Sequence, residues 1–379
     1  MKILIVGSGS YVLGDIYGPG VVLRSVLQWL KRESTGSGQK ASVTISYNSP
    51  DTVPVKTAEI KQVMNEMNIS IDEISVDFIS TSEVVTTLES SDILACFVSV
   101  PDKHHRFYSE LCMKLGIPLW LVKPLCGDWD DAQALVEVQN STKAKVWVDY
   151  HKRFDASNAW LKIKANRGDM GRLLSYSVDY HQPRTLPIEV FSWTRDVDVF
   201  SYIGCHYIDQ VFYLFPDARL ISASAEPLKG IVYEETGQFD GVLATLNFET
   251  HAGPLLCPMN VGWFNPEGSP TKSLQTIKAQ FERGVVTLDQ TRRGIHVWAD
   301  EGVSEVNPYF FGETLNLDGD VEFAGYGYES VGQFLDSIIN RTDWPTDGCI
   351  PTLTEAAKTE FVLYAVQQSL MTGQKFVVV

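Results

Sequence analysis

Short apolar runs alternate with helical patterns through the first 150 residues. The runs are rich in β-branched and aromatic residues and end abruptly in polar residues or proline, which is typical of strands buried on both faces of a parallel sheet. Strands are predicted at residues 2–6, 42–47, 76–79, 93–100, 119–122 and 145–150, and helices between them, for example at 21–32, 104–115 and 129–139. This alternation predicts right-handed βαβ units and a doubly wound sheet.

Beyond residue 150 the pattern changes to a period of two. Apolar and polar residues alternate in segments 174–181 and 242–248, so one face of each strand is expected to be buried. Further strands are predicted at 220–225, 276–281, 285–288 and 295–299, and helices at 158–164, 203–215, 328–339 and 354–370. We therefore predict an α/β Rossmann domain over residues 1–150. An α+β domain with a large, open, mostly antiparallel sheet follows over residues 151–379, and its last helix is able to pack back on the first domain.

Composition narrows the class of protein. The chain has 379 residues, which fits two domains with ample core, and a net charge of −16, which argues against nucleic acid or an anionic membrane as partner. No apolar run is long enough to span a bilayer and no signal-peptide pattern is present, so we expect a cytoplasmic protein. The six cysteines show no CxxC spacing, which fits the same reducing compartment, and no HExxH or similar cluster predicts a metal site.

A glycine-containing loop follows the first predicted strand. Gly7-Ser8-Gly9-Ser10 opens like a dinucleotide fingerprint, in which glycines let main-chain N–H groups approach a pyrophosphate. Val12 occupies the position of the third glycine, so we expect a loop enlarged by several residues, with Pro19 as the first residue of the next helix. A plain glycine turn is the alternative. The candidate cofactor contacts in this loop are Gly7, Gly9, Ser10 and Tyr11.

The second predicted strand ends in Tyr47-Asn48-Ser49-Pro50-Asp51. An enzyme that prefers NAD usually places a carboxylate here, because that group accepts a hydrogen bond from the ribose 2′-OH. Asn48 is able to bond either a hydroxyl or a phosphate, and no arginine follows directly. Asn48 is therefore a further candidate cofactor contact, and the choice between NAD and NADP stays open.

Two segments place candidate chemistry at the ends of the fourth and fifth strands. Pro101-Asp102-Lys103-His104-His105 opens a helix near the expected nicotinamide, although a solvated first-turn histidine is the alternative. Lys123, in Val122-Lys123-Pro124, ends an apolar strand, where lysine is rare without a partner or ligand. Desolvation beside a cationic nicotinamide would favour the neutral amine that proton transfer needs. A surface lysine with a buried stem is the alternative.

A third segment, Tyr202-Ile203-Gly204-Cys205-His206-Tyr207-Ile208-Asp209, is predicted to be helical. Tyr202, His206 and Asp209 then fall on one polar stripe, opposite a packed stripe of Gly204, Ile208, Val211 and Phe215. A polar stripe is usually a solvated face. This stripe holds Tyr, His and Asp in place of Lys and Glu, which favours a functional site.

Together these residues resemble the glucose–fructose oxidoreductase/inositol dehydrogenase (Gfo/Idh/MocA) family. That family has Pro-Asn-x-x-His after the fourth strand, Glu-Lys-Pro after the fifth, and Asp-x-Gly-x-His-x-x-Asp on a helix of its second domain. The chain has the three segments above at these places, with Val122 and Tyr202 where the family has acids. Tyr150-His151-Lys152-Arg153-Phe154 is similar to the family's segment at the domain junction. The ending from Gly325-Tyr326-Gly327-Tyr328-Glu329 also follows the family, so the resemblance spans nearly the whole chain.

The resemblance implies an NAD(P)-dependent oxidoreductase acting on a CH–OH group of a sugar, sugar derivative or cyclitol. Lys123 and His206 are expected to converge on the reacting hydroxyl, with Tyr202 as a third catalytic member. Arg153 and Asp209 are expected to contact substrate together with Lys123 and His206. The alternatives are a structural salt bridge for Arg153 and, for Asp209, a contact that holds His206. The remaining expected cofactor contacts are Ser99, Pro101, His105, Lys123 and Pro124.

The resemblance also implies homo-oligomers, dimers or tetramers, built through the exposed sheet of the second domain. Two alternatives remain open. The first is an enzyme of the same fold that cleaves glycosides through transient oxidation by NAD. The second is a non-catalytic sensor that binds a dinucleotide, which the missing acids at Val122 and Tyr202 keep in consideration.

Overall fold

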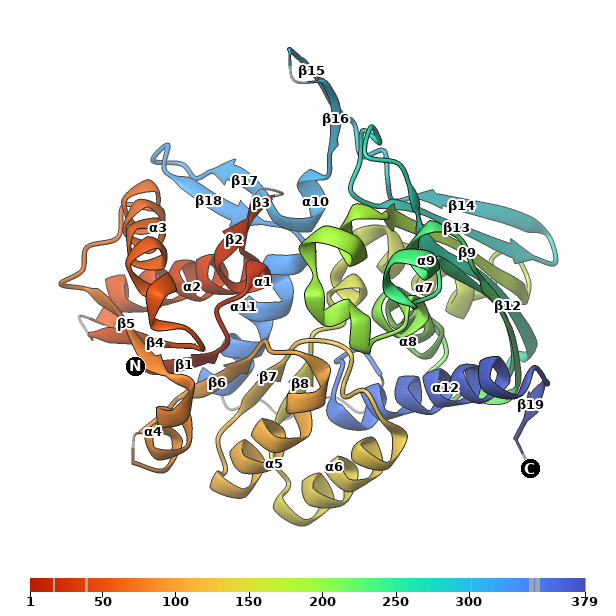
Figure 1. Ribbon diagram of the computed structural model, residues 1–379, viewed down its shortest axis with the longest axis horizontal. Coiled ribbons are helices and arrows are strands. Elements are labelled where there is room, and N and C mark those ends of the chain that lie inside the picture. The colour runs from red at the N-terminus through yellow and green to blue at the C-terminus, as the bar shows by residue number, and fades with distance from the viewer. Residues whose placement is uncertain are drawn as a thin grey trace.

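Two large sheets organise the chain (Figure 1). The computed structural model describes residues 1–15, 18–37, 40–90, 92–300, 302–340, 344 and 348–378. The first sheet has six strands and lies within the N-terminal half of the chain, and the second has seven strands and is built mainly from residues 173–289.

The first sheet is parallel throughout, as predicted. Its strands are ordered β5-β4-β1-β6-β7-β8. Their bounds are β1 Lys2–Val6, β4 Ala41–Tyr47, β5 Ile74–Ser80, β6 Ala95–Val98, β7 Leu119–Leu121 and β8 Val146–Val148. The strand order reverses at β1, which pairs with β4 on one side and β6 on the other. In sheets of this kind, ligands bind at the carboxyl ends of the strands beside such a reversal.

Helices cover both faces of this sheet, because alternate residues of each strand point to opposite layers. One layer contains α2 (Val21–Ser37), α3 (Val53–Glu66) and α11 (Tyr326–Ile339), whose apolar residues join Phe97 and Trp120 in one core. The other contains α4 (Val84–Ser90), α5 (His105–Leu115) and α6 (Trp129–Thr142), which pack on the intervening strand residues. The helix α11 thus joins this layer although it comes late in the chain.

The second sheet is mixed and mostly antiparallel, as predicted. Its order is β14-β13-β9-β12-β11-β10-β19, and only β9 and β12 among its described pairs run parallel. The bounds are β9 Leu173–Pro183, β10 Arg219–Leu228, β11 Gly241–Thr250, β12 Gly253–Asn265, β13 Leu274–Phe281, β14 Gly284–Asp289 and β19 Phe376–Val377.

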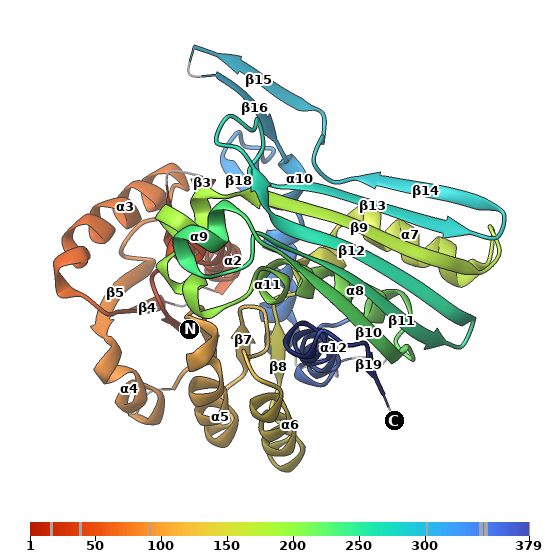
Figure 2. The same ribbon diagram turned by 45° about the vertical axis from the view of Figure 1, so that its right-hand side comes forward.

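Helices cover one face of this second sheet. On α8 (Cys205–Leu214), Tyr207 packs its ring against Tyr180 and Phe212 against Phe248, and α7 (Ala156–Arg167) contacts α8. The last helix, α12 (Leu353–Thr372), contacts both α6 of the first sheet and β10 of the second (Figure 2). The opposite face exposes apolar side chains from six strands: Leu174, Ile221, Leu243, Leu256, Phe264, Leu274 and Val285.

Small elements complete the fold. The strands β15 (Ile295–Ala299) and β16 (Gly302–Val306) form a hairpin that projects from the body of the molecule, so the predicted strand 295–299 lies outside the large sheet (Figures 1 and 2). A second hairpin, β17 (Gly312–Leu315) and β18 (Val321–Ala324), follows the short helix α10 (Pro308–Phe311). The helix α9 (Ile231–Thr236) connects β10 to β11.

The glycine loop is enlarged, as predicted. It contains α1 (Ser10–Leu13) and a hairpin of β2 (Gly14–Asp15) and β3 (Gly18–Pro19). The prediction that Pro19 begins the following helix is wrong. Pro19 pairs with Gly14 in the hairpin, and α2 begins at Val21.

The predicted helix 203–215 also needs correction. A π-helical turn, Phe200–Gly204, comes first, and α8 begins at Cys205. Every residue of α8 is buried, so its polar side is not a solvated face. The second sheet covers one side of this helix. The other sides are covered by α7, α12 and the segment after β8. The periodicity of a single helix does not reveal such covering by several partners.

Candidate active site

The glycine loop is pressed against the end of β6. A Cβ atom at Gly7 would lie 2.1 Å from the carbonyl oxygen of Ser99, and Gly7 has a φ of +108°, so a larger residue does not fit there. The Gly7 N–H donates to Ser46 Oγ at 2.9 Å. From α3, Lys56 Nζ donates to the carbonyl oxygen and Oγ of Ser8 at 2.8 and 2.7 Å. A backbone that only glycine permits, with a cation beside it, suits the phosphates of a dinucleotide.

Sequence patterns did not reveal Lys56, because it lies on a helix after the second strand, far from the loop along the chain. The other predicted residues of the loop, Gly9, Ser10 and Tyr11, lie at and within α1. The Tyr11 side chain turns toward the segment after β8, where its hydroxyl donates to Asp149. The loop therefore reaches across the carboxyl ends of the strands.

Asn48 lies at the carboxyl end of β4. Its Oδ1 accepts a hydrogen bond from Thr81 Oγ1 at 2.7 Å, which orients the amide nitrogen as the remaining donor. Such a donor suits a ribose hydroxyl and a phosphate oxygen equally. Asn48 and Lys123 follow β4 and β7, on opposite sides of the strand-order reversal, as the two ends of a bound dinucleotide require.

His105 ties the end of β6 to the turn after β7. Its ring is fully buried, with Nδ1 3.0 Å from the Pro124 carbonyl oxygen and Nε2 2.8 Å from that of Val100. Glu360 of α12 holds the same turn from the other side, where its Oε1 accepts from the Cys126 N–H at 3.2 Å. Both groups position the segment containing Lys123. The two ring nitrogens of His105 are already occupied by main-chain carbonyls.

Lys123 projects toward the π-helical turn before α8. Its Nζ donates to the carbonyl oxygen of Tyr202 at 2.6 Å and lies 4.2 Å from the centre of the Tyr202 ring. That ring stacks on Trp263 of β12, with centroids 5.4 Å apart. The contact therefore brings the end of the first sheet to the second. A carbonyl oxygen and the face of an aromatic ring both attract an ammonium ion, so these two contacts hold the Lys123 side chain in place.

His206 lies one turn after Tyr202, on α8. The residue is 6% exposed, and its Nδ1 has no hydrogen-bond partner among the described residues. Burial lowers the pKa of His206 well below its usual range, and the nearby Lys123, His151 and Lys152 add to this effect. A neutral imidazole accepts protons. The structure thus brings together the three residues predicted to be catalytic, Lys123, Tyr202 and His206.

A second histidine lies against His206, with ring centroids 4.8 Å apart. This residue, His151, has its Nδ1 3.3 Å from Asp149 Oδ2, and the Tyr11 hydroxyl donates to the same oxygen at 2.7 Å. Asp149 is fully buried. Neither Asp149 nor His151 was expected to carry chemistry from its place in the sequence. The available signal was an acid-x-His pattern at the carboxyl end of a buried strand.

Arg153 and Asp209 are each other's partner. Both side chains are fully buried, and Arg153 Nη2 and Nε donate to Asp209 Oδ1 and Oδ2 at 2.6 and 2.9 Å. Arg153 also donates to the carbonyl oxygens of Gly348 and Ile350. This pair fastens α8 to the segment after β8. It occupies the groups that were predicted to contact substrate.

Lys152 is buried between α8 and the second sheet. Its Nζ donates to Gln290 Oε1 at 3.1 Å and to Gln275 Oε1. Burial lowers the pKa of Lys152 to about 7. The rings of Tyr180 and Tyr207 lie 5.8 and 5.1 Å from the same nitrogen.

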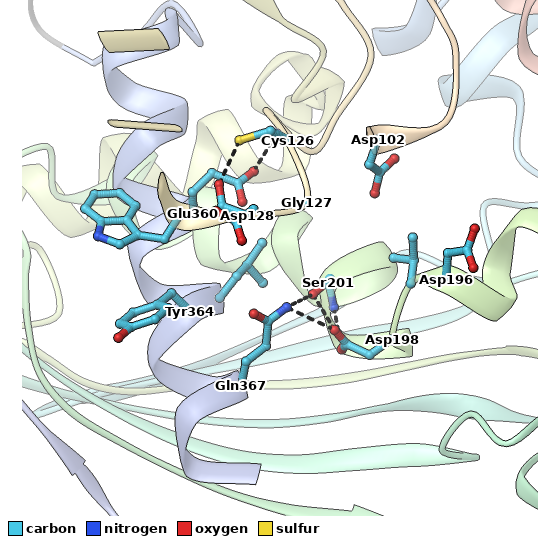
Figure 3. A pocket seen from close by; sticks show the side chains of 13 residues that line it. Asp102, Cys126, Gly127, Asp128, Asp196, Asp198, Ser201, Glu360, Tyr364 and Gln367 are labelled. Atoms are coloured by element: carbon cyan, nitrogen blue, oxygen red, sulfur yellow. Dashed lines mark hydrogen bonds between the residues drawn. The ribbon is translucent and has the colours of Figure 1, made fainter. Parts of the chain in front are cut away.

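A small acidic cavity of about 60 Å³ adjoins this cluster (Figure 3). Asp102 points into it from the end of β6, and the cavity has room for a few water molecules but not for a sugar. Burial raises the pKa of Asp102, and the charges of His105 and Lys123 partly offset this. The Asp198 carboxylate accepts from Ser201, and α12 supplies Glu360.

Two further observations concern the described part of the chain. No group of three or more His, Cys, Asp or Glu side chains there is placed to hold a metal ion. Within the same residues, none of the helices has both the length and the apolar character needed to cross a membrane.

Comparison with known proteins gives one curated relative and many similar structures. An inositol 2-dehydrogenase from Rhizobium meliloti (strain 1021) is 23% identical over 158 residues, which is 41% of this chain. The match covers 47% of the relative, so the chain spans about half the length of the curated relative it matches. No family model matches the chain.

Solved structures match over nearly the whole chain. The myo-inositol 2-dehydrogenase from Lactobacillus plantarum has a TM-score of 0.71 at 15% identity and covers 100% of this chain and 99% of its own. The scyllo-inositol dehydrogenase from Lactobacillus casei, with bound NAD(H) and scyllo-inositol, has a TM-score of 0.68 at 16% identity and covers 99% and 98%. The chain therefore has the fold of these inositol dehydrogenases, the fold that the resemblance of its motifs implied.

Proposed function

We propose that this protein is an NAD(P)-dependent oxidoreductase that moves a hydride between a nicotinamide cofactor and a secondary alcohol or ketone of a cyclitol or sugar. The observation that carries the proposal is the cluster of Lys123, Tyr202 and His206 at the carboxyl end of β7. Such a reaction needs a group that takes or gives the hydroxyl proton while the carbinol carbon is held close to the nicotinamide.

The cofactor in this proposal lies across the carboxyl ends of β4, β1 and β6. The backbone at Gly7 packs so closely against Ser99 that only glycine fits, and Lys56 places a cation beside this loop. Both features support pyrophosphate binding there. Asn48 would meet the ribose at the β4 end, and it suits NAD and NADP alike. The bound nicotinamide supplies the hydride acceptor or donor. A similar fold with NAD(H) and scyllo-inositol bound supports both the cofactor and a cyclitol as substrate.

The two candidate acid–base groups take different roles. The charged ammonium of Lys123, fixed by the Tyr202 carbonyl oxygen and ring, donates a hydrogen bond to the substrate oxygen and orients it. The imidazole of His206 is neutral because it is buried among cations, so it is the group able to accept the hydroxyl proton. In the reduction of a ketone the same groups act in the reverse sense.

The test is an assay of the purified protein with NAD⁺ or NADP⁺ against myo-inositol, scyllo-inositol and a panel of aldoses. We expect reduced cofactor to accumulate with at least one polyol, together with one equivalent of ketone. Cofactor binding, followed by fluorescence, without any redox change would instead indicate a sensor. Cleavage of a glycoside without net cofactor reduction would indicate the glycosidase alternative. Either result overturns the proposal.

We also propose a homo-oligomer, a dimer or tetramer, that forms through the uncovered face of the second sheet. The seven apolar side chains exposed there support this, since large apolar patches on a protein surface mark interaction sites. Light scattering should give a mass of at least twice 42.3 kDa. Double substitution of Leu243 and Leu256 with lysine should reduce it to the monomer mass. A wild-type monomer contradicts the proposal.

The cytoplasm is the proposed location, where NAD(P) and the six free cysteines would be in a reducing environment.

A further inference from the structure

The proposed base His206 lacks the carboxylate that would help it hold a proton. Position 202, one turn earlier, carries tyrosine, and the Nδ1 atom of His206 has no hydrogen-bond partner among the described residues. The nearby charge of Lys123 also disfavours a proton at His206. An imidazolium formed at His206 is therefore poorly stabilised and must pass its proton on before another turnover.

His151 is a nearby histidine that is able to accept this proton and that, unlike His206, has a carboxylate as hydrogen-bond partner. Its ring lies 4.8 Å from that of His206, and its Nδ1 lies 3.3 Å from Asp149 Oδ2. Asp149 is fixed from two further sides, because Tyr11 donates to Oδ2 at 2.7 Å and Ser330 donates to Oδ1 at 2.6 Å. A carboxylate at Nδ1 sets the histidine tautomer and leaves Nε2 to accept a proton.

We propose that Asp149 and His151 form a dyad that receives the substrate proton from His206, replacing the carboxylate absent at position 202. This role rests on the proposed oxidoreductase function. The dyad acts through His206, so His151 and Asp149 are positioning and relay residues. Asp149 lies outside the segments that resemble the family, and His151, which lies within one of them, was not expected to carry chemistry.

The proton balance is simple. In alcohol oxidation the carbinol C–H bond breaks and its electron pair leaves as hydride to the nicotinamide. The O–H bond breaks and its proton passes to His206. His206 then transfers that proton to His151, whose positive charge is balanced by Asp149, and the dyad finally releases it to water. One alcohol thus gives one ketone, one reduced cofactor and one proton.

The surroundings of His151 fix the geometry of this relay. The Tyr326 ring stacks on it with centroids 5.4 Å apart, and the Phe310 ring lies 5.2 Å away. Tyr11, whose hydroxyl donates to Asp149 and also lies 3.3 Å from His151 Nδ1, belongs to α1 of the enlarged glycine loop. The loop that would hold the cofactor is therefore connected directly to the proposed relay.

The first experiment examines the dyad without substrate or cofactor. Proton NMR of protein labelled with ¹⁵N-histidine should show a downfield imidazole N–H resonance from the hydrogen bond between His151 Nδ1 and Asp149. We expect His151→Gln and Asp149→Asn each to abolish it, and His206→Gln to retain it. Absence of the resonance in the wild type, or its persistence in Asp149→Asn, overturns the dyad.

The second experiment examines the relay during turnover of the polyol that the wild-type enzyme oxidises. His151→Gln should lower kcat at least about tenfold, with KM and cofactor affinity nearly unchanged, because the dyad acts on the proton and not on binding. Imidazole in the buffer should restore kcat of His151→Ala, whereas pyrazole, which is similar in shape but hardly basic, should not. A merely structural role would not distinguish the two compounds.

A matched control comes from a second His–Asp pair at the surface. His251 Nδ1 lies 2.8 Å from Asp217 Oδ1, and both residues are exposed, so His251→Gln should leave kcat unchanged. Asp149 is buried, and its substitution risks misfolding. Tyr11→Phe is therefore a gentler test: it removes one donor to the same carboxylate and should lower kcat less than His151→Gln does. If His151→Gln turns over like the wild type, the relay is wrong although the proposed function stands. If the wild type oxidises no polyol, the proposed function itself fails.

Discussion

The ammonium group of Lys123 donates a hydrogen bond to the main-chain carbonyl oxygen of Tyr202 at 2.6 Å and lies 4.2 Å from the centre of the same residue's ring. The residue at position 202 therefore orients Lys123 through its backbone and its ring face, and neither interaction requires an acid. Tyrosine at position 202 is therefore able to hold the lysine in place without a carboxylate.

Lys123 is the first residue to test. Lys123→Met should lower kcat by at least about a hundredfold, the lower end of typical acid–base contributions, while the cofactor dissociation constant changes little. Lys114→Met is the matched control, since Lys114 is an exposed lysine whose partner is Glu110 on the same helix. Steady-state kinetics and cofactor fluorescence measure the two effects. Equal turnover in Lys123→Met and wild type would remove the lysine from the mechanism.

Glu360 should act on the reaction through the position of Lys123. Its carboxylate accepts from the Cys126 N–H at 3.2 Å, and burial raises the pKa of Glu360 well above its usual range. Glu360→Gln keeps an oxygen acceptor and should retain most activity. Glu360→Leu leaves a buried N–H unsatisfied and should cost about 1–3 kcal/mol of stability, with a clear fall in kcat. Denaturant titration and kinetics on both variants test this; similar kinetics for Gln and Leu would contradict it.

Arg153 and Asp209 should matter for stability more than for substrate affinity. Removing one partner of a buried pair leaves an uncompensated charge, so Arg153→Met should lower the free energy of unfolding by about 3–5 kcal/mol. Exchange of both residues for apolar ones of similar size should cost less than this single substitution. Urea unfolding measures both. A stable Arg153→Met variant with a greatly raised KM would instead support the predicted substrate contact.

Lys152 should make stability depend on pH. Its pKa is about 7 in the folded chain because burial disfavours the charged amine, whereas the ordinary value is 10.5. Between these two values the unfolded chain binds more protons at this residue, so the contribution of Lys152 to the free energy of unfolding rises with pH. The slope is at most about 1.4 kcal/mol per pH unit.

Lys152→Met removes this titration while the neighbouring buried groups keep theirs. The difference in unfolding free energy, wild type minus variant, should therefore increase as the pH is raised from about 7 to about 9. Urea unfolding across this range provides the measurement. A difference that stays constant would show that Lys152 keeps its proton in the folded chain.

The sequence determined the order and type of the main elements. The run that forms β6 is apolar on both faces because helices cover both sides of a parallel sheet, and this pattern is visible without a structure. The end of a strand placed Lys123 at the ligand-binding edge, and helical spacing placed His206 one turn after Tyr202. The positions of Lys123 and His206 could be inferred because they depend only on residues nearby in the sequence, and local periodicity contains that information.

Which side chains meet depends on how distant segments pack together. Tyr11 and Asp149 are 138 residues apart in sequence, and Arg153 and Asp209 are 56 apart. Neither pairing follows from a local pattern, because each depends on how separate elements pack. The same packing buried α8 on all sides and placed His151 against His206. Periodicity predicts which face of an element is covered, but the partner on that face is set by contacts between distant segments.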